Sequence, residues 1–230
     1  DASQAAPAQL RSTWDAFIAS LRDGSPQAIV TSAETVSEQL RRTDPAAYPP
    51  AWRLDLEVRY HQLRPFVIAR VLYLLAALGF IVSLSRRGRA ALAIGRLAMW
   101  SGLAIHASGI LLRVVLGQRP PVSNFYETML WLPFIAVVLA VVFERIYRAT
   151  YFGLAGVTLG AITLVLADAV PLDPSITPVV AVLRSNLWLT IHVLTIVASY
   201  GALALATALA HIYGWLYVVH RGRTAVSMAT

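Results

Sequence analysis

The stretch Leu183–Tyr200, LRSNLWLTIHVLTIVASY, begins in a polar turn and then enters an apolar run that continues past Ala210. A run of about 18–20 apolar residues is long enough to span the hydrocarbon core of a bilayer. His192 lies less than two turns inside this run. An ionisable residue within a span is costly, so it usually has a partner or a function. The stretch therefore predicts a transmembrane helix with one histidine near its entrance.

The composition extends this prediction to the whole chain. Hydrophobic residues make up 57% of the sequence and charged residues 13%, and the mean hydropathy is +0.63. Soluble domains are closer to half apolar and a quarter charged. We predict an all-α, polytopic membrane protein with about five transmembrane helices, at residues 65–84, 90–116, 128–143, 151–170 and 187–219. The sequence contains no cysteine, which excludes disulfides and thiol or cysteine–metal chemistry within it.

Residues 1–64 are polar and are expected to form a small helical segment. Apolar residues recur at helical spacing from Leu10 to Leu21 and from Ile29 to Leu40, and Gly24-Ser25-Pro26 separates the two stripes. A third helix is expected over 52–63. We therefore divide the chain into an N-terminal segment at 1–64, a membrane region at 65–220 and a tail at 221–230. So small a segment is expected to pack against a partner or the membrane surface.

The basic residues predict the topology. All nineteen are arginine, and the net charge of +7 belongs to the membrane region, where twelve arginines face four acidic residues. Basic loops stay in the cytoplasm. This rule places the N-terminal segment and the loops 117–127 and 171–186 outside, and the C-terminus inside. No basic run with interleaved aromatic residues suggests nucleic-acid binding.

Three histidines lie within the spans. Neutral imidazole is a common haem-iron ligand, so His192 is a candidate ligand, and hydrogen bonding to a neighbouring carbonyl is an equally weighted alternative. Trp188 lies one turn earlier on the same face and could cover a flat aromatic ligand. For His106 a helix-packing role is favoured over a role as second ligand or proton relay. His211, about 28 Å from His192 along a straight helix, cannot share its site.

The charged residues near the outer side give weaker indications of a binding site. Arg113, Arg119 and Arg184 could bind the carboxylates of an anionic ligand, although ordinary interfacial placement explains each of them alone. Asp168 lies near the outer end of its span, where water reaches it, and no chemistry is assigned to it. The sequence contains no phosphate loop, no Ser/His/Asp arrangement and no paired intramembrane carboxylates, so no catalytic residue is assigned.

Three segments carry a resemblance to a known family. They are Leu54–Phe66 (LDLEVRYHQLRPF), Gly117–Thr128 (GQRPPVSNFYET) and Val179–Tyr200. In this order they resemble CcsA (ResC), including the CcsA half of fused CcsBA proteins, which serve system II cytochrome c biogenesis. These proteins belong to the haem-handling superfamily that also contains CcmC and CcmF.

The resemblance implies a part of a holocytochrome c synthase that transports haem b and presents it at the outer face of the bacterial cytoplasmic (inner) membrane. His192 would be an axial ligand of the haem iron. The implied partners are a CcsB (ResB)-like protein or fused half, apocytochrome c, thiol-reducing biogenesis proteins and the lipid bilayer. The remaining cofactor-binding candidates are Trp188, Arg119, Asn124, Tyr126, Glu127 and His106.

Two departures from the family pattern accompany the resemblance. The tryptophan-rich WWD segment is absent, and a second external histidine would lie beyond the ends of this sequence. The chain is therefore expected to be a piece of a longer protein that is incomplete for haem attachment. A non-catalytic membrane transporter, which would use Arg113, Arg119 and Arg184 for an anion and His106 for proton coupling, is the alternative. A structural or partner-binding subunit is a third possibility.

Overall fold

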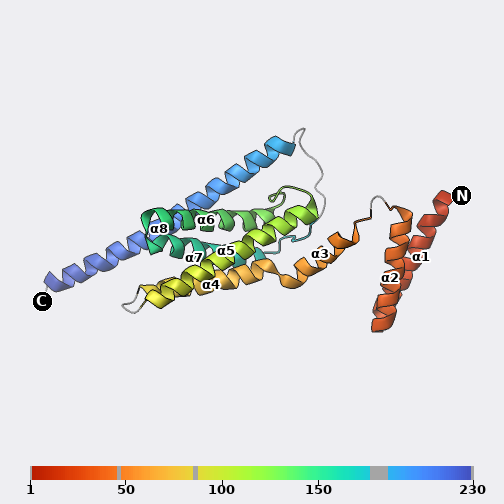
Figure 1. The fold of residues 1–230 in the computed structure, drawn as a ribbon, viewed down its shortest axis with the longest axis horizontal. Helices are drawn as coiled ribbons and strands as arrows, with labels where there is room; N and C mark the ends of the chain where they lie inside the picture. The colour runs from red at the N-terminus through yellow and green to blue at the C-terminus, as the bar shows by residue number, and fades with distance from the viewer. Residues whose placement is uncertain (1, 46–47, 85–87, 177–185, 229–230) are drawn as a thin grey trace. The chain divides into compact units, whose positions relative to one another are not determined.

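The computed structural model describes residues 2–45, 48–84, 88–176 and 186–228, and Figure 1 shows the helices they form. These residues form helices and connecting turns and contain no strand. Five stretches are long and apolar enough to cross a membrane. The predicted all-α, five-span membrane class is therefore confirmed. The helices are α1 (Ala2–Asp23), α2 (Pro26–Thr43), α3 (Ala51–Leu63), α4 (Pro65–Ser83), α5 (Arg89–Gly117), α6 (Phe125–Tyr147), α7 (Thr150–Ala169) and α8 (Asn186–Met228).

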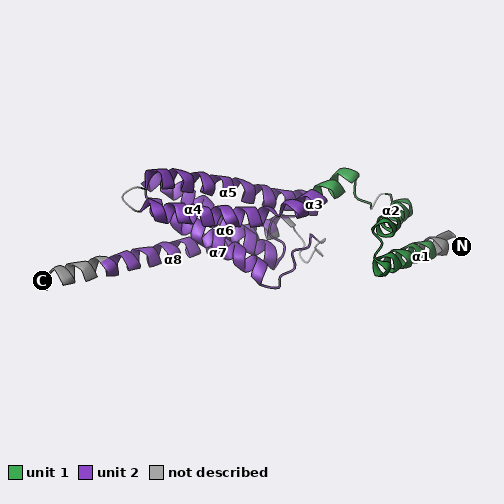
Figure 2. Cartoon of the chain, turned by 90° about the horizontal axis from the view of Figure 1, so that it is seen from below, with its two compact units in different colours: residues 1–56 green, residues 57–230 purple. Residues whose placement is uncertain are grey.

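The chain divides into two compact units, Asp1–Leu56 and Glu57–Thr230, coloured separately in Figure 2. In the first unit α1 and α2 pack against each other, and Gly24 adopts a left-handed φ of +73° at the turn between them. A residue with no Cβ adopts this conformation without steric cost. The hydroxyls of Ser20 and Ser32 lie 2.7 Å apart and join the two helices. The two apolar stripes expected in this segment therefore belong to one helical hairpin.

The second unit is a bundle in which small residues allow close helix packing. α4 packs mainly on α5 and α7, and α6 packs mainly on α7 and α8. A Cβ added at Gly79 of α4 would lie 2.8 Å from the Cα of Gly95 in α5. A Cβ added at Gly156 of α7 would lie 2.3 Å from the Cβ of Ala140 in α6. The hydrophobic effect is weak between helices in lipid, so the van der Waals contacts made at such close approach stabilise the bundle instead.

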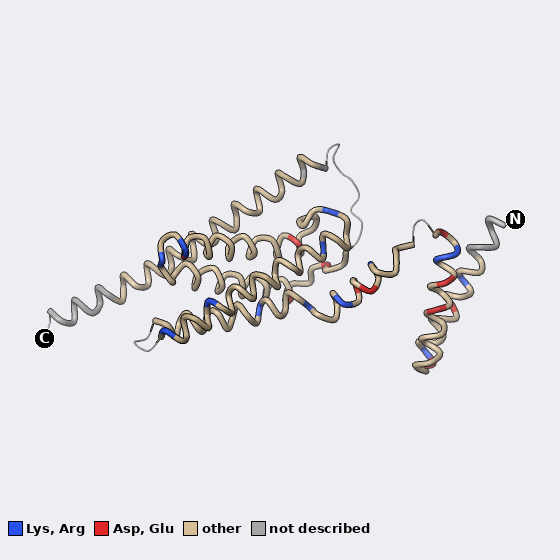
Figure 3. Tube along the Cα trace, viewed as in Figure 1, with Lys and Arg blue, Asp and Glu red and all other residues tan. Residues whose placement is uncertain are grey.

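Successive helices of the bundle run in opposite directions and so define two ends (Figure 1). The Arg113 end, as we call it, holds the start of α4, the end of α5, the start of α6, the end of α7 and the start of α8. The Arg96 end holds the opposite termini of α4 to α7. Figure 3 shows that charged residues gather toward these ends, while the middle of the helices is mostly uncharged. This distribution is the one expected for helices that cross a bilayer.

Two helices extend beyond the predicted spans. α6 begins at Phe125 rather than 128, because the side chain of Asn124 caps the helix by accepting a hydrogen bond from the Glu127 N–H at 2.8 Å. It also continues to Tyr147, four residues past the predicted end at 143. α8 continues to Met228 instead of ending at 219. The predicted limits followed hydropathy, which does not detect polar helix ends.

Candidate functional site

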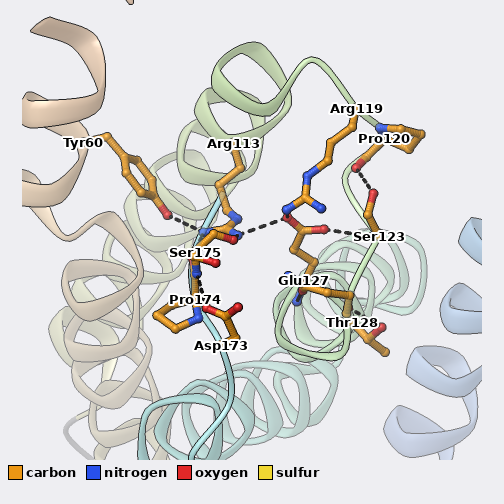
Figure 4. Close-up of polar contacts among 11 residues, drawn as sticks. Tyr60, Arg113, Arg119, Pro120, Ser123, Glu127, Thr128, Asp173, Pro174 and Ser175 are labelled. Atoms are coloured by element: carbon orange, nitrogen blue, oxygen red, sulfur yellow. Dashed lines mark hydrogen bonds and ion pairs between the residues drawn. The ribbon is translucent and has the colours of Figure 1, made fainter. Parts of the chain in front are cut away.

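One carboxylate organises the Arg113 end of the bundle (Figure 4). Oε1 of Glu127 accepts a hydrogen bond from Arg113 Nη2 at 3.0 Å and another from Arg119 Nη2 at 2.9 Å. The side chains of Glu127, Arg113 and Arg119 are 3%, 4% and 9% exposed. Hydrogen bonds between ionised groups are stronger than neutral ones, and burial reduces their screening. Glu127 therefore joins the end of α5, the following loop and the start of α6.

The loop before α6 fixes the position of this carboxylate. The backbone N–H of Ser123 donates to Oε2 of Glu127 at 2.8 Å, while Asn124 caps the Glu127 N–H. The hydroxyl of Ser123 also donates to the Pro120 carbonyl at 3.0 Å. An acidic residue in the first turn is further stabilised by the helix dipole. Local sequence thus holds Glu127 in the position where the two arginines meet it.

Arg113 extends the network to two further segments. Its Nη1 donates to the Pro174 carbonyl at 2.9 Å and lies 3.3 Å from the hydroxyl of Tyr60 in α3. The guanidinium carbon lies 5.1 Å from the ring centroid of Tyr126, a cation–π distance. In the same connection, Asp173 accepts a hydrogen bond from the Ser175 N–H at 2.9 Å, which lowers the pKa of its carboxyl. One buried arginine therefore contacts α3, α6 and the segment after α7.

The contacts of Arg113 and Arg119 are relevant to the prediction that these arginines bind an anionic ligand. Arg113 and Arg119 converge as expected, but both donate to a carboxylate of the same chain, so two positive charges share one negative charge. Their deep burial favours a structural role over an open anion-binding role. Arg184, the third candidate, lies outside the described residues. The transporter interpretation, which needs all three arginines, gains no support from this geometry.

His106 is enclosed in the middle of the bundle with both ring nitrogens engaged. Nδ1 lies 3.1 Å from the hydroxyl of Tyr73, and Nε2 lies 3.0 Å from the Leu130 carbonyl. Because a carbonyl only accepts, Nε2 carries the hydrogen and the Tyr73 hydroxyl donates to Nδ1. Phe66 and Phe134 meet the ring edge-on. These contacts favour the helix-packing interpretation and leave no ring nitrogen for a ligand or a proton relay.

His192 has the opposite environment. It lies on the exposed side of α8, and we find no hydrogen bond or ion pair to its imidazole within the described residues. Trp188, one turn earlier, is 71% exposed. In the described ranges, no hydrogen bond or ring contact joins these two residues to Arg119, Asn124, Tyr126 or Glu127. The predicted candidates therefore form two groups, a closed polar network and an open helix face.

Some residues of this region were missed or given no role from the sequence. Asp168, to which no chemistry was assigned, forms an ion pair with Arg70 that joins α7 to α4. Tyr60 and the carbonyls of Pro174 and Ser175 complete the environment of Arg113. The available signal was the presence of two acids and several arginines at the ends of apolar runs, because intramembrane charges are usually paired. Which acid pairs with which arginine depends on helix packing.

The fold and the site together define a polytopic helical membrane protein with a buried charge network at one end and, on an open helix, an imidazole that has no partner among the described residues. The chain matches no protein-family model. It is 32% identical over 182 residues to protein NrfI of Wolinella succinogenes, an alignment that covers 75% of this chain and 20% of that protein. The chain thus spans about a fifth of the length of this relative.

This similarity corrects one prediction. The assignment to the CcsA (ResC) or fused CcsBA family of system II is wrong, because the relative found is NrfI, a cytochrome c nitrite reductase maturation protein that is not a member of that family. The three segments that suggested CcsA do not identify that family. The similarity supports the more general part of the prediction, a role in cytochrome c biogenesis.

Proposed function

We propose that this chain is a membrane-spanning part of a protein that acts in cytochrome c maturation, and that it holds haem b, the substrate of that process, through His192. The similarity to NrfI supports the maturation role. The observation that carries the haem proposal is the exposed imidazole of His192, which has no partner in the described part of the chain although it lies in an apolar span. Leaving such a group unpaired in lipid is costly, so a partner is expected.

The open face of α8 fits one side of a haem. A neutral imidazole nitrogen is a suitable axial ligand for haem iron. The exposed indole of Trp188, one turn away, offers a flat apolar surface that can stack against a porphyrin edge. His106 is excluded from this role because both of its nitrogens are engaged. We assign no second axial ligand among the described residues.

The network around Glu127 has a supporting role in this proposal. It fixes the loop 117–127 and the segment after α7, which leads into the start of α8. Arg119, Asn124, Tyr126 and Glu127 would thus act as positioning residues and would not contact haem. We place the Arg113 end at the outer face of the bacterial cytoplasmic membrane, because the more strongly basic loops lie at the opposite end. Haem held there would be accessible to apocytochrome c.

The experiment compares the haem content of the purified wild-type protein with that of His192→Ala and His211→Ala variants. His211 is the matched control, since it is also an exposed histidine of α8, but its Nδ1–H donates to the Thr207 carbonyl at 2.8 Å. We expect the Soret absorbance to fall in His192→Ala and to stay at the wild-type level in His211→Ala. Added imidazole should restore pigment to a His192→Gly variant. Equal haem content in all variants would remove His192 from the mechanism.

A further inference from the structure

A second candidate site lies at the Arg96 end, away from His192 and the Glu127 network. A cavity of about 520 Å³ opens between α5 and α6. α5 packs mainly on α4 and α6 on α7, so the two helices diverge enough to leave this space. Its lining combines three arginines and one glutamate with an apolar wall: Arg96, Met99, Trp100, Val141, Glu144, Arg145 and Arg148.

The position of Arg96 is determined by residues from three helices. Its Nε donates to Oε1 of Glu144 at 2.8 Å, and Glu144 is buried with 5% of its side chain exposed. The other carboxylate oxygen lies where a Cβ on Gly153 of α7 would come within 2.2 Å, so glycine at this position leaves room for the carboxylate as it stands. Glu144 therefore orients the guanidinium from one side, and the terminal nitrogens of Arg96 have no other partner in the ranges described.

The other two arginines of the cavity are also available to bind a ligand. Arg145 is exposed, and Arg148 is exposed where the backbone turns out of α6 with a left-handed φ of 53°. We find no ion pair for either side chain among the described residues. Counting Arg96, Arg145 and Arg148 against Glu144 gives the cavity a net charge of +2. This charge favours an anionic ligand.

The apolar wall indicates what kind of anion binds. Met99 and Val141 belong to helices that are long and apolar enough to cross a membrane, and Trp100 is 53% exposed beside them. Arginines at the end of a span attract anionic headgroups, and basic pockets between spans bind phosphate-bearing lipids. A free anion would use the arginines but would leave the apolar wall uncovered, whereas a phospholipid covers both.

We propose that the cavity between α5 and α6 binds the phosphate headgroup of an anionic membrane phospholipid, with the arginines on the phosphate and an acyl chain along Met99, Trp100 and Val141. This inference is independent of the proposed haem function, since none of these residues belongs to that site. The bound lipid would fill the gap between α5 and α6 at the Arg96 end, which the Arg96–Glu144 pair bridges.

The test uses the protein in phosphatidylcholine vesicles that contain either brominated phosphatidylglycerol or brominated phosphatidylcholine. Bromine quenches nearby tryptophan, and the contribution of Trp100 is obtained by comparison with Trp100→Phe. We expect quenching of Trp100 to favour phosphatidylglycerol, and this preference to fall about five-fold for each of Arg145→Gln and Arg148→Gln. Neither arginine has an ion pair in the described part, so both variants should fold, which circular dichroism verifies.

Trp215 of α8 is the internal control, because the cavity beside it is lined by Ala210, His211, Gly214 and Val218 and contains no arginine among its lining residues. Its quenching should not distinguish the two lipids. Equal quenching of Trp100 by both lipids, or an unchanged preference in the arginine variants, would overturn the proposal. Loss of the preference on adding inorganic phosphate, but not chloride at equal ionic strength, would also overturn it in favour of a free-phosphate site.

Discussion

Arg113 and Glu127 form a buried ion pair in which Nη2 lies 3.0 Å from Oε1. The two residues come from different helices, and the same oxygen also accepts a hydrogen bond from Arg119. A buried charge is tolerated only when it is paired and hydrogen-bonded. The three side chains therefore depend on one another, and the loss of the carboxylate affects two cations at once.

Replacing Glu127 by Ala should lower the free energy of unfolding by about 3–5 kcal/mol, because it leaves two buried guanidinium groups without their anion. The measurement is denaturant-induced unfolding in detergent, followed by circular dichroism. Glu34→Ala, at an exposed position of α2, serves as the control and should change stability by less than about 0.5 kcal/mol. Equal effects of the two substitutions would show that the network contributes nothing to stability.

Replacing Tyr73 by Phe should cost about 1–3 kcal/mol, since Nδ1 of the buried His106 loses its hydrogen-bond donor. Haem content should not change, because His192, and not His106, is the proposed haem ligand. Thermal unfolding and the Soret absorbance of one preparation measure both quantities. Tyr213→Phe, at a residue that is 71% exposed, is the control and should leave stability unchanged. A loss of haem in Tyr73→Phe without loss of stability would contradict the packing role.

Replacing Gly156 by Ala should destabilise the bundle by about 1–3 kcal/mol, because the new methyl group collides with Ala140 and pushes α6 away from α7. Gly214→Ala is the matched control, as a Cβ at Gly214 has no atom within 4 Å. That control should be neutral or slightly stabilising, since alanine favours the helix. Thermal unfolding measures the stability of the two variants. Similar losses of stability in both would mean that the contact between α6 and α7 can relax.

Acidification should loosen the segment around Asp173. Its pKa is lowered from the ordinary value of 3.8 by the hydrogen bond from the Ser175 N–H, so the ionised form is favoured in the folded state. A lowered carboxyl pKa contributes stability above the ordinary value, and this contribution disappears as the pH falls through the folded value. Amide hydrogen exchange of Ser175 should therefore accelerate below about pH 4 beyond the intrinsic rate. In Asp173→Ala the same amide should exchange rapidly without this pH dependence, and identical profiles would exclude the carboxylate.

The apolar runs predicted α4, α5 and α7 to within a residue or two of their observed ends. α6 was predicted to begin later because Glu127 was taken as a residue outside the membrane. Its burial depends on Arg113, which is fourteen positions earlier on another helix, and hydropathy along one segment does not contain that information. Long-range pairing of this kind is decided by helix packing.

Some site candidates were predicted correctly from the sequence and others were not, again because helix packing decides which side chains meet. The histidine-bearing spans were evident from the sequence, and the packing role favoured for His106 agrees with its contacts. The sequence did not distinguish the closed environment of His106 from the open one of His192, because both lie in apolar runs. The difference arises since α5 is covered by α4 and α6 around His106, whereas the start of α8 exposes His192.

The way in which α8 is attached has a mechanical consequence. Among its residues with described exposure, Val197, Gly201 and Leu205 are buried, and a Cβ at Gly201 would lie 2.8 Å from the Leu132 carbonyl. His192 lies about 13 Å from Gly201 along the helix on one side, and Val219 lies about 27 Å away on the other. α8 is thus held over the middle of its length, from Val197 to Ile212, and His192 lies before this contact. A small tilt of α8 on this contact would move His192 and the opposite end of the helix in opposite directions.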